Sequence, residues 1–425
     1  MNKKKKMGNS LYKQVLYSNE TLDLSSRRIN EIQMKTICEA LIKNKSIKKL
    51  NLSRNLIDDQ SISLLCESLR LENFIEEINL SFNFRIREGI EILCNFLKNN
   101  RIIKKLDLSS LTFNQRSFES ISEMLEINHT LRDLDISSNL INEKESLKKI
   151  CKSLEKNTSL KKFNLSHNVL TSTGCEIIAE MLRNNKLKLK KLILNVNQIF
   201  CSGMKSISES LIINTTLTRI DLANNSLKCE GIKYLSNCLE HNKTIKKLDI
   251  SSNKISGKGA YSIKQMLLKN KSLLHIDLSN NNLICQEVKT ISSSLKHNFS
   301  LKSINLSFNK IKENGANEII KVMKINKKIT EFKVEWNSFA YLFEYKIQFL
   351  CDCNHQWHYT NHTSLFPIFI RVVFIFVLSL KEKEKKFQIK IPKFVLFEII
   401  KRIDRKSYFN HSIKERKGVV VIEKN

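Results

Sequence analysis

The stretch SSNKISGKGA, residues 251–260, has residue types that could bind a phosphate. It follows a short apolar run and precedes the apolar segment YSIKQMLL, which gives the order strand, Gly-Lys-Gly turn and helix. A phosphate-binding loop has this order and needs G-x-x-x-x-G-K-[ST], because backbone amides cradle the phosphates and the hydroxyl reaches the metal ion. Here Ser252 replaces the first Gly, and Gly259 replaces the Ser or Thr after Lys258. We therefore predict no bound nucleotide and no other cofactor.

The segment CDCNHQWH and the residues after it could bind zinc. Five potential soft ligands lie within twelve residues: Cys351, Cys353, His355, His358 and His362. Zinc sites usually space their cysteines as C-x2–4-C, whereas a single residue separates these two, and no second ligand pair follows in the tail. A chance grouping on the surface explains these candidate ligands better than a metal site does.

An internal repeat explains the Gly-Lys-Gly stretch better than a nucleotide site. LDISSN at 248–253 has counterparts 28 residues away on either side, IDLANN at 220–225 and IDLSNN at 276–281. Such a period fixes the architecture and is recognised before any other inference is made. Twelve units follow one another at a spacing of 28 residues, with 29 used twice. Their first apolar residues are Leu22, Leu50, Ile78, Leu106, Leu134, Phe163, Leu192, Ile220, Leu248, Ile276, Ile304 and Phe332.

Each recurring position of the unit has a physical role. Two alternating apolar residues, such as Leu248 and Ile250, are typical of a short strand with one buried face. Asn stands five positions after the first apolar residue in ten of the twelve units, and Arg27 and Leu111 interrupt the series. A buried Asn side chain can satisfy the open backbone groups where a strand turns away. We therefore predict that the stacked copies form a ladder.

The second half of the unit is predicted to be a helix. Apolar residues such as Ile263 and Leu267 have the spacing of an inward helical stripe. Six of the nine glycines stand eleven positions after the first apolar residue, where a tight turn would enter this helix. They are Gly89, Gly174, Gly203, Gly231, Gly259 and Gly315.

The unit reads L-x-x-L-x-L-x-x-N-x-L, which resembles the leucine-rich repeat, and its length is similar to the ribonuclease-inhibitor type. The resemblance covers roughly residues 20–340 and extends to the repeat domains of NOD-like receptors and Ran GTPase-activating proteins. It implies an α/β fold, a horseshoe-shaped solenoid with a parallel inner sheet and outer helices. We expect a basic segment at 1–19, the repeat domain at 20–340 and a separate tail at 341–425.

The eleven cysteines also follow the repeat. Cys38, Cys66 and Cys94 share one position of the unit, where Ser208 and Ala179 stand in other copies. The position requires a small buried group, which a free Cys supplies. We predict reduced thiols rather than a disulfide framework. Because the basic start MNKKKKMGNS lacks the apolar run of a secretory signal, we expect a cytoplasmic protein.

The net charge of +30 points to nucleic acid or an anionic membrane, but no single block of the chain holds the excess. On the outward side of the strands, a column rich in Lys and Arg lies about 6.6 Å from a column rich in Asp, close enough for the two to neutralise each other. A third column is mostly Ser. We therefore expect polar protein contacts here rather than nucleic acid, with a solvated ion-pair lattice as the alternative. The basic column is Lys49, Lys105, Lys162, Lys191, Arg219 and Lys247, and the acidic column is Asp23, Asp107, Asp135, Asp221, Asp249 and Asp277.

The tail has a different composition from the repeats. Its stretch LFPIFIRVVFIFVLSL at 365–380 is 16 residues long and has Arg371 in its middle. A helix that spans a bilayer needs about 20 apolar residues. We therefore favour a β-rich segment that caps the last repeat over a membrane helix. A disordered tail or an error in the gene model also fits these residues.

The sequence contains no nucleophile–base motif, and the resemblance implies a non-enzymatic protein-binding scaffold that uses the concave face and its loop edge. We expect protein partners and no small-molecule substrate. One alternative is a Ran-type GTPase activator, although those proteins carry an acidic tail after their repeats and this tail is basic and apolar. The other is a structural component of a cytoskeletal or axonemal complex.

The main irregularity of the repeats indicates where a partner could bind. It lies in SFNFRIRE at 81–88 and SSLTFNQR at 109–116, where Phe82, Arg85 and Arg87 combine large area with polar reach, as interface anchors do. The alternative is that Phe84 enters the core to compensate for a shifted loop. The full set of partner-binding candidates is Phe82, Arg85, Arg87, Lys105, Asp107, Asp135, Lys247, Asp249, Asp277, Phe308 and Trp336.

Overall fold

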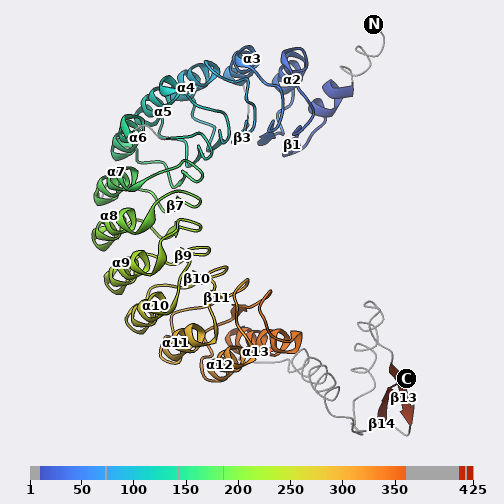
Figure 1. The fold of residues 1–425 in the computed structure, drawn as a ribbon. Coiled ribbons are helices and arrows are strands. Elements are labelled where there is room, and N and C mark those ends of the chain that lie inside the picture. The colour runs from blue at the N-terminus through green and yellow to red at the C-terminus, as the bar shows by residue number, and fades with distance from the viewer. Residues whose placement is uncertain are drawn as a thin grey trace.

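Twelve short parallel strands line the inside of an open arc, and helices form its outside (Figure 1). The structure is a computed structural model that describes residues 10–71, 74–141, 144–184, 186–359, 411–416 and 419–424. The strands pair in chain order. They are β1 (Thr21–Asp23), β2 (Lys49–Asn51), β3 (Glu77–Asn79), β4 (Lys105–Asp107), β5 (Asp133–Asp135), β6 (Lys162–Asn164), β7 (Lys191–Ile193), β8 (Arg219–Asp221), β9 (Lys247–Asp249), β10 (His275–Asp277), β11 (Ser303–Asn305) and β12 (Glu331–Lys333).

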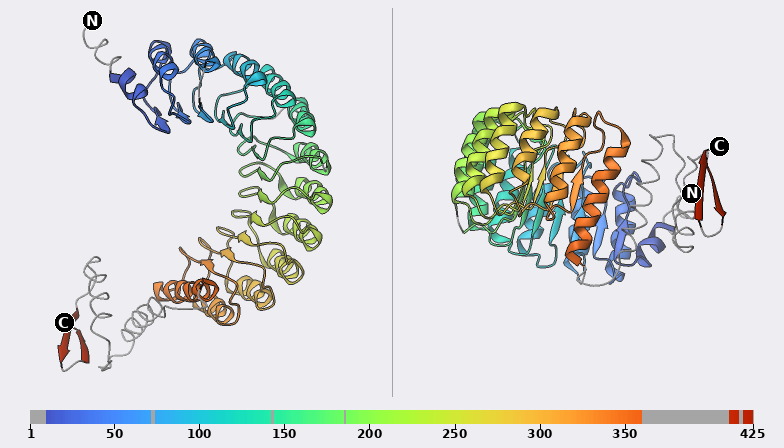
Figure 2. Two further views of the ribbon diagram at one scale, coloured as in Figure 1. Left: turned by 180° about the vertical axis from the view of Figure 1, so that it is seen from behind. Right: turned by 90° about the horizontal axis from the view of Figure 1, so that it is seen from below.

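One helix follows each strand, and neighbouring helices lie side by side around the outside of the arc (Figure 2). They are α2 (Glu31–Lys43), α3 (Asp59–Arg70), α4 (Gly89–Asn99), α5 (Gln115–Ile127), α6 (Lys144–Lys156), α7 (Ser172–Arg183), α8 (Phe200–Ile213), α9 (Lys228–His241), α10 (Gly257–Lys269), α11 (Cys285–Leu295), α12 (Glu313–Ile325) and α13 (Tyr341–Tyr359). A separate antiparallel pair consists of β13 (His411–Arg416) and β14 (Val419–Lys424). The predicted α/β solenoid with a parallel inner sheet and outer helices is confirmed.

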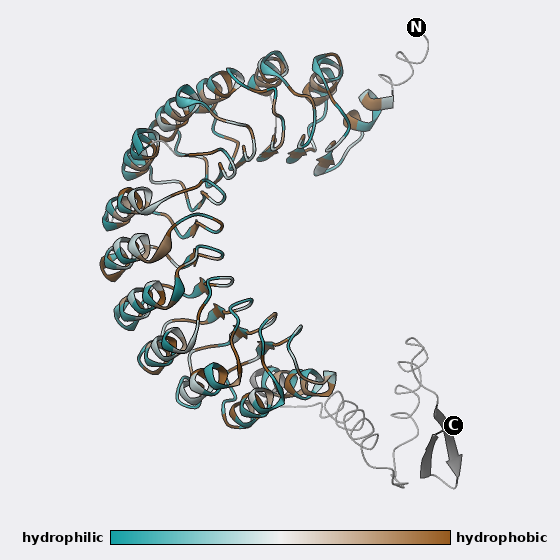
Figure 3. Ribbon diagram, in the orientation of Figure 1, coloured by the Kyte–Doolittle hydropathy of each residue, from teal (hydrophilic) through white to brown (hydrophobic). Residues whose placement is uncertain are grey.

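The period of the sequence sets the register of the sheet. Each first apolar residue lies opposite its counterpart in the next strand, as Leu22 does with Leu50 and Ile276 with Ile304. These side chains are buried between the sheet and the helices, and the residues on either side of them face out. Polar and apolar residues accordingly alternate around every coil (Figure 3).

The predicted asparagine ladder joins successive coils. Asn253 is fully buried, and its Oδ1 accepts the backbone N–H of Asn225 at 3.0 Å and of Leu227 at 3.2 Å. Its Nδ2 donates to the carbonyl of Leu222 at 2.9 Å, also in the preceding repeat. The side chain thus satisfies backbone groups that the turn would otherwise leave unpaired. At Leu111 the ladder is interrupted, because that buried side chain has no donor or acceptor.

A second asparagine series closes the helices at their C-termini. Asn270 caps α10, and its Nδ2 donates to the carbonyl of Leu239 at 2.6 Å in the preceding repeat. Its Oδ1 accepts the N–H groups of Ser272 and Leu273, at 2.9 and 2.7 Å. The N-x-[ST] triplets that recur in the sequence, such as Asn44-Lys-Ser and Asn270-Lys-Ser, therefore encode this buried cap.

The repeat glycines have a different role from the predicted one. They lie in the first turn of a helix, and none has the positive φ that a glycine turn would need. A Cβ on Gly259 would lie 2.7 Å from the Cγ2 of Ile255, and one on Gly315 would lie 2.6 Å from the Cγ2 of Ile311. In these two repeats the position favours glycine because the buried residue before the helix packs against its backbone.

Helical segments cover both ends of the repeats within the described residues. Residues 10–16 are helical, and Val15 is buried against the first coil. At the other end, α13 buries Ile347 and Cys351, and Asn354 donates to the carbonyls of Asn326 and Ile329 at 3.0 and 2.8 Å. The cover next to the last repeat is therefore helical. The apolar stretch 365–380 lies outside the described residues.

The remaining sequence predictions about compartment concern cysteines and membrane spans. All eleven cysteines are free, and burial raises the pKa of the Cys38 thiol to about 11 and that of Cys66 to about 12. Over the part of the chain that the structure describes, none of the helices combines the length and the apolar character that crossing a bilayer requires.

We predict that Leu278→Ala lowers the free energy of unfolding by about 2–5 kcal/mol. Leu278 is fully buried between adjacent coils, so truncation leaves a cavity in the core. Urea denaturation measures the loss, with Lys289→Ala on the exposed face of α11 as a control expected to lie within about 0.5 kcal/mol of the parent. A neutral Leu278→Ala would contradict the register of the repeats.

We predict that Asn281→Ala lowers the free energy of unfolding by about 1–3 kcal/mol. The change removes acceptor bonds from the N–H groups of Asn253 and Ile255 and leaves these buried groups unpaired. The same denaturation assay tests it. A loss no larger than that of Lys289→Ala would show that the ladder does not stabilise the coils.

Candidate functional site

A row of twelve residues with left-handed backbone runs along the edge of the concave sheet, one in each repeat just before the ladder position. We call this row the ridge. Its φ angles lie between 52° and 60°, although none of its members is glycine. The N–H of every ridge residue except Trp336 donates to a carbonyl of the next coil, as in the bond from Phe82 N to Ser109 O at 3.1 Å. The ridge residues are Ser26, Arg54, Phe82, Ser110, Ser138, His167, Val196, Asn224, Ser252, Asn280, Phe308 and Trp336.

The first aromatic cluster lies on the ridge near the N-terminal end. The Phe82 and Phe84 rings meet edge to face, with centroids 6.2 Å apart. The guanidinium of Arg54, one repeat earlier, lies 4.3 Å from the centre of the Phe82 ring, a cation–π contact. Phe84 is 58% exposed, so it does not enter the core, and Ile86 is buried instead. The alternative in which Phe84 compensates for a shifted loop is therefore wrong.

The loop that carries Arg85 and Arg87 is fixed by two aspartates of the preceding repeat. Asp58 forms an isolated parallel bridge with Arg85. Asp59 Oδ1 accepts the backbone N–H of Arg87 and that of Gly89, both at 2.7 Å. Both arginine side chains remain exposed. The structure therefore brings Phe82, Arg85 and Arg87 into one surface region with an anchored backbone.

A second aromatic cluster lies on the ridge near the C-terminal end. Phe308 and Trp336 occupy the same position of successive repeats, and their rings stack with centroids 5.8 Å apart and an interplanar angle of 11°. Phe308 is 55% exposed and Trp336 is 74% exposed. The bond from Phe308 N to Glu335 O, at 2.9 Å, holds the turn between them. The two rings thus present a rigid apolar platform to solvent.

The concave face pairs its charges differently from the prediction. Lys105 Nζ lies 2.8 Å from Glu77 Oε1, and Lys49 Nζ lies 3.8 Å from the same atom. Lys162 Nζ bonds Asp133 Oδ2 at 3.0 Å. In all these pairs the acid belongs to the same column as the lysine, not to the Asp column two residues on. The expectation that the basic and acidic columns neutralise each other therefore does not describe these contacts.

The Asp column is satisfied by the serines of the third column. Asp107 Oδ1 accepts the N–H of Ser109 at 3.0 Å and its hydroxyl at 2.7 Å, and Asp249 makes the same two bonds with Ser251. These contacts close a turn at the end of each strand. A shallow hollow of about 270 Å³ over β1–β6 brings together Lys105, Asp107 and Asp135. Lys247, Asp249 and Asp277 lie farther along, on β9 and β10.

Three consecutive carboxylates lie side by side on β8, β9 and β10. Asp249 is opposite both Asp221 and Asp277 in the register of the sheet. Burial and the charge of Asp221 raise the pKa of Asp249 to about 6, against the bonds from Ser251. Asp277 instead receives a bond from Asn305 Nδ2 at 2.8 Å, and Asp135 one from Asn164 Nδ2 at 2.6 Å. Asp249 thus has an aspartate on each neighbouring strand, whereas Asp135 and Asp277 each have an asparagine amide on one neighbouring strand.

The zinc-ligand candidates are dispersed over α13 and beyond it. Cys351 lies in the core, where burial raises its thiol pKa to about 12, whereas His355 is exposed. Their neighbour Cys353 is two residues from Cys351 and therefore faces another side of the helix. His358 also lies in α13, and His362 lies outside the described residues. Among the described residues, no group of three or more His, Cys, Asp or Glu is placed to hold a metal ion.

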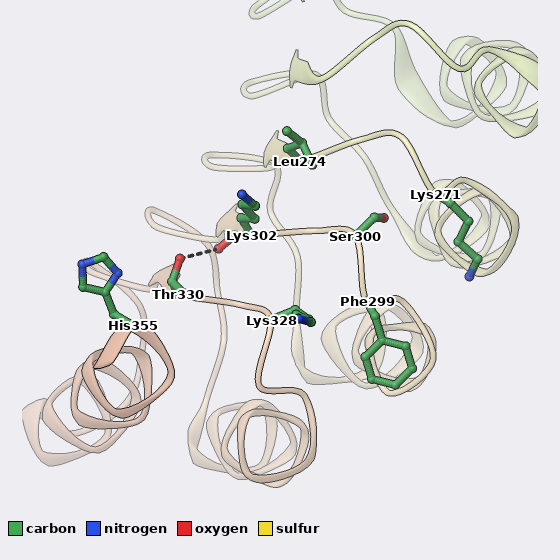
Figure 4. A pocket seen from close by; sticks show the side chains of 8 residues that line it. All are labelled: Lys271, Leu274, Phe299, Ser300, Lys302, Lys328, Thr330 and His355. Carbon is green, nitrogen blue, oxygen red and sulfur yellow. Dashed lines mark hydrogen bonds between the residues drawn. The ribbon is translucent and has the colours of Figure 1, made fainter. Parts of the chain in front are cut away.

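A second hollow, of about 810 Å³, opens where the last helices lead into the last strands (Figure 4). Its lining has three lysines and two hydroxyl groups but no carboxylate. The Thr330 hydroxyl donates to the carbonyl of Lys302 at 3.4 Å, and His355 of α13 closes one side. Its charge suits contact with an anion. The lining residues are Lys271, Leu274, Phe299, Ser300, Lys302, Lys328, Thr330 and His355.

A family model described as "Leucine Rich repeat" matches five segments of the chain, residues 43–66, 156–179, 214–236, 241–264 and 297–319. The chain contains leucine-rich repeats. Because every repeat of 28 or 29 residues carries a full α-helix, the leucine-rich repeats resemble the ribonuclease-inhibitor type, as the sequence predicts.

Solved structures of other repeat proteins are similar to this chain. The yeast Rad7–Elc1 complex matches with a TM-score of 0.49 and 15% identity over 72% of this chain and 75% of the other. The leucine-rich-repeat-containing protein LegL7 from Legionella pneumophila matches with a TM-score of 0.47 and 19% identity over 70% and 92%. No curated protein matches the sequence.

The sequence did not reveal the ridge as a structural row. Its residues share no side-chain type, since they include Ser, Asn, Arg, His, Val, Phe and Trp. What they share is a backbone angle, and the only sequence signal is their fixed place before the ladder asparagine. Arg54 was missed for this reason, although it lies against Phe82. The repeat register would have identified it once the aromatic positions were aligned.

We predict that Asp249→Asn stabilises this leucine-rich-repeat protein by about 1–2 kcal/mol at pH 7.5. With its pKa at about 6, above the ordinary value of 3.8, folded Asp249 binds a proton more tightly than the unfolded chain does. Its contribution to stability therefore falls as the pH rises through about 4 to 6. Asn keeps the acceptor role, as Asn79 and Asn305 do toward Ser81 and Ser307.

Urea denaturation of the parent and Asp249→Asn at pH 4.5 and 7.5 measures this effect. The stabilisation should be present at pH 7.5 and should shrink toward pH 4.5, where Asp249 is protonated in the folded protein. Equal differences at both pH values would show that the pKa of Asp249 is not raised.

Proposed function

We propose that this protein is a non-enzymatic, cytoplasmic scaffold that binds protein partners through its concave sheet and ridge. The observation that carries the proposal is the pair of aromatic clusters on the ridge. Phe84, Phe308 and Trp336 are each more than half exposed, on turns whose backbone is held by the neighbouring coil. Large aromatic side chains with arginine nearby are typical interface anchors, because they bury much area at a low cost in side-chain entropy.

The arrangement of the clusters supports this function. They occupy the same position of the repeat near the two ends of the arc, Phe82 just after β3 and Trp336 just after β12 (Figure 1). Between them, the outward residues of the strands are mostly charged or polar. A partner that follows the concave face would meet an apolar anchor at each end and a polar surface between them.

The proposal is tested by capturing partners from a cytosolic extract on the immobilised full chain and identifying them by mass spectrometry. Two ridge variants are compared with the parent, Phe82→Ala/Arg85→Ala/Arg87→Ala and Phe308→Ala/Trp336→Ala. Tyr261→Ala is the matched control, because Tyr261 is 56% exposed on the outer helix α10. Melting temperatures measured beforehand show that each variant is folded.

We predict that at least one ridge variant reduces the recovery of a specific partner about tenfold or more, while Tyr261→Ala does not. The substituted side chains are exposed, apart from the half-buried Phe82, and their backbone bonds remain, so melting temperatures should stay close to that of the parent. Equal recovery of every partner by both ridge variants and the control would contradict binding at the ridge. The identity of the captured partner would also decide between the scaffold, the GTPase activator and the cytoskeletal component.

A further inference from the structure

The first outward column of the sheet changes its charge pattern halfway along the arc. On β2–β5 it alternates in sign, with Lys49, Glu77, Lys105 and Asp133. On β6–β9 it is basic in four consecutive strands, and these residues lie opposite one another in the register of the sheet. The four are Lys162, Lys191, Arg219 and Lys247.

The alternating half of the column is internally paired. Glu77 contacts the lysines on both sides of it, at 2.8 and 3.8 Å, and Asp133 bonds Lys162 at 3.0 Å. In the basic half, Lys191 lies between Lys162 and Arg219 with no acid of its own column beside it. Like charges directly opposite each other destabilise a sheet. The native protein keeps this arrangement over four strands, at a cost in stability.

A second row of cations widens the basic region. Lys161, Lys190 and Lys246 stand one residue before the first column on β6, β7 and β9. Burial and the neighbouring charges of Lys190, Lys188 and Arg132 lower the pKa of Lys161. Burial, Arg219 and Lys162 lower the pKa of Lys191. Burial is the largest cause for both lysines, and the neighbouring cations lower both pKa values further.

The acidic column does not cover the centre of this region. On β6 and β7 its positions hold Asn164 and Ile193, and acids return only at Asp221 and Asp249 on β8 and β9. On the other side, Asp135 of β5 marks the boundary. The least compensated cations therefore lie on and just before β7, next to the buried side chain of Ile193.

The size of the region indicates what kind of anion fits. Four strands spaced about 4.8 Å apart extend over about 14 Å, the length of about four residues of extended peptide. A nucleic acid strand presents charge along its whole length and would meet Asp135 on one side and Asp249 and Asp277 on the other. A short acidic segment of a protein fits over the cations of β6 and β7, where the second column holds Asn164 and Ile193 instead of acids.

We infer that strands β6–β9 are the docking site for a short acidic segment of a partner protein, recognised mainly by Lys161, Lys162, Lys190, Lys191 and Arg219. This inference rests on the proposed function, since it assigns a chemistry to one part of the concave face. The ridge clusters anchor apolar groups of the partner, and this basic region selects for acidic sequence between them.

The test uses the full chain and a fluorescent peptide of about eight glutamates, long enough to span the four strands. Anisotropy is measured at about 50 mM salt, where surface charges are weakly screened. The site variant is Lys161→Ser/Lys190→Ser/Lys191→Ser. The matched control, Lys48→Ser/Lys104→Ser/Lys105→Ser, removes the same charge from the equivalent positions at the start of β2 and β4. A single-stranded oligonucleotide of equal charge is the competing ligand.

We expect the site variant to bind the peptide about tenfold or more weakly, and the control to stay within about twofold of the parent. The oligonucleotide should bind the parent more weakly than the peptide does. Equal losses in the two variants would show attraction to net charge alone. Tighter binding of the oligonucleotide, lost in the site variant, would make the region a nucleic-acid site. Either result overturns the inference.

A second measurement needs no ligand. At low salt the site variant should melt at a higher temperature than the control, because it removes opposed like charges whereas the control breaks ion pairs. A site variant that melts no higher than the control would overturn the inference that the cations are uncompensated. If the peptide fails to bind while ridge variants still lose a captured partner, the docking site is wrong and the scaffold function stands. If the peptide fails to bind and the ridge variants also lose no captured partner, both the docking site and the scaffold function are wrong.

Discussion

The buried asparagine that joins each coil to the preceding one is the interaction on which the solenoid depends. A strand of three residues has few bonds of its own, and the chain must then leave the sheet with its backbone groups in an apolar interior. Asn281 meets that need by accepting two N–H groups and donating to the carbonyls of Ile250 and Leu278. An amide of this length has both the acceptor and the donor at the required distances. The break at Leu111 is tolerated because Asn139 still accepts the N–H of Leu111, at 2.8 Å.

The ladder also determines what the ridge can do. Because the ladder residue points inward, the residue before it must turn outward, and the backbone reaches that geometry in the left-handed region. A bulky or β-branched residue in this conformation is strained by about 1–2 kcal/mol. Ser or Asn holds half of the ridge positions, yet Phe82, Val196, Phe308 and Trp336 occupy four of them. A strained aromatic that stays exposed, as Phe308 and Trp336 do, contributes little to folding, which is why we attribute these two side chains to binding.

Most of the fold could be predicted from the sequence because the repeat fixes it. The positions of the anchors, the ladder and the parallel sheet follow from a period of 28 residues and a polar residue in a buried column. Two roles could not be predicted, since they depend on distances between coils. The first is that of Gly259, which makes room for Ile255, and the second is the pairing of Lys105 with Glu77 rather than with Asp107. For the candidate site, the sequence predicted which residues take part but not their arrangement. The exposure of Phe308 and its stacking on Trp336 depend on the turn geometry.

The repeat that makes the fold predictable also makes its exceptions informative. Buried positions must satisfy the same contacts in every coil, so variation there is restricted to residues of similar size and polarity. Outward positions of the strands carry no such restriction, and alternating charges would always be the more stable choice for them. The first column follows that choice on β2–β5, where Glu77 and Asp133 bond their lysine neighbours, and departs from it on β6–β9. A sheet that forgoes ion pairs it forms elsewhere in the same column has a requirement there other than folding, and an acidic partner would supply the charge that Lys191 lacks in its own column.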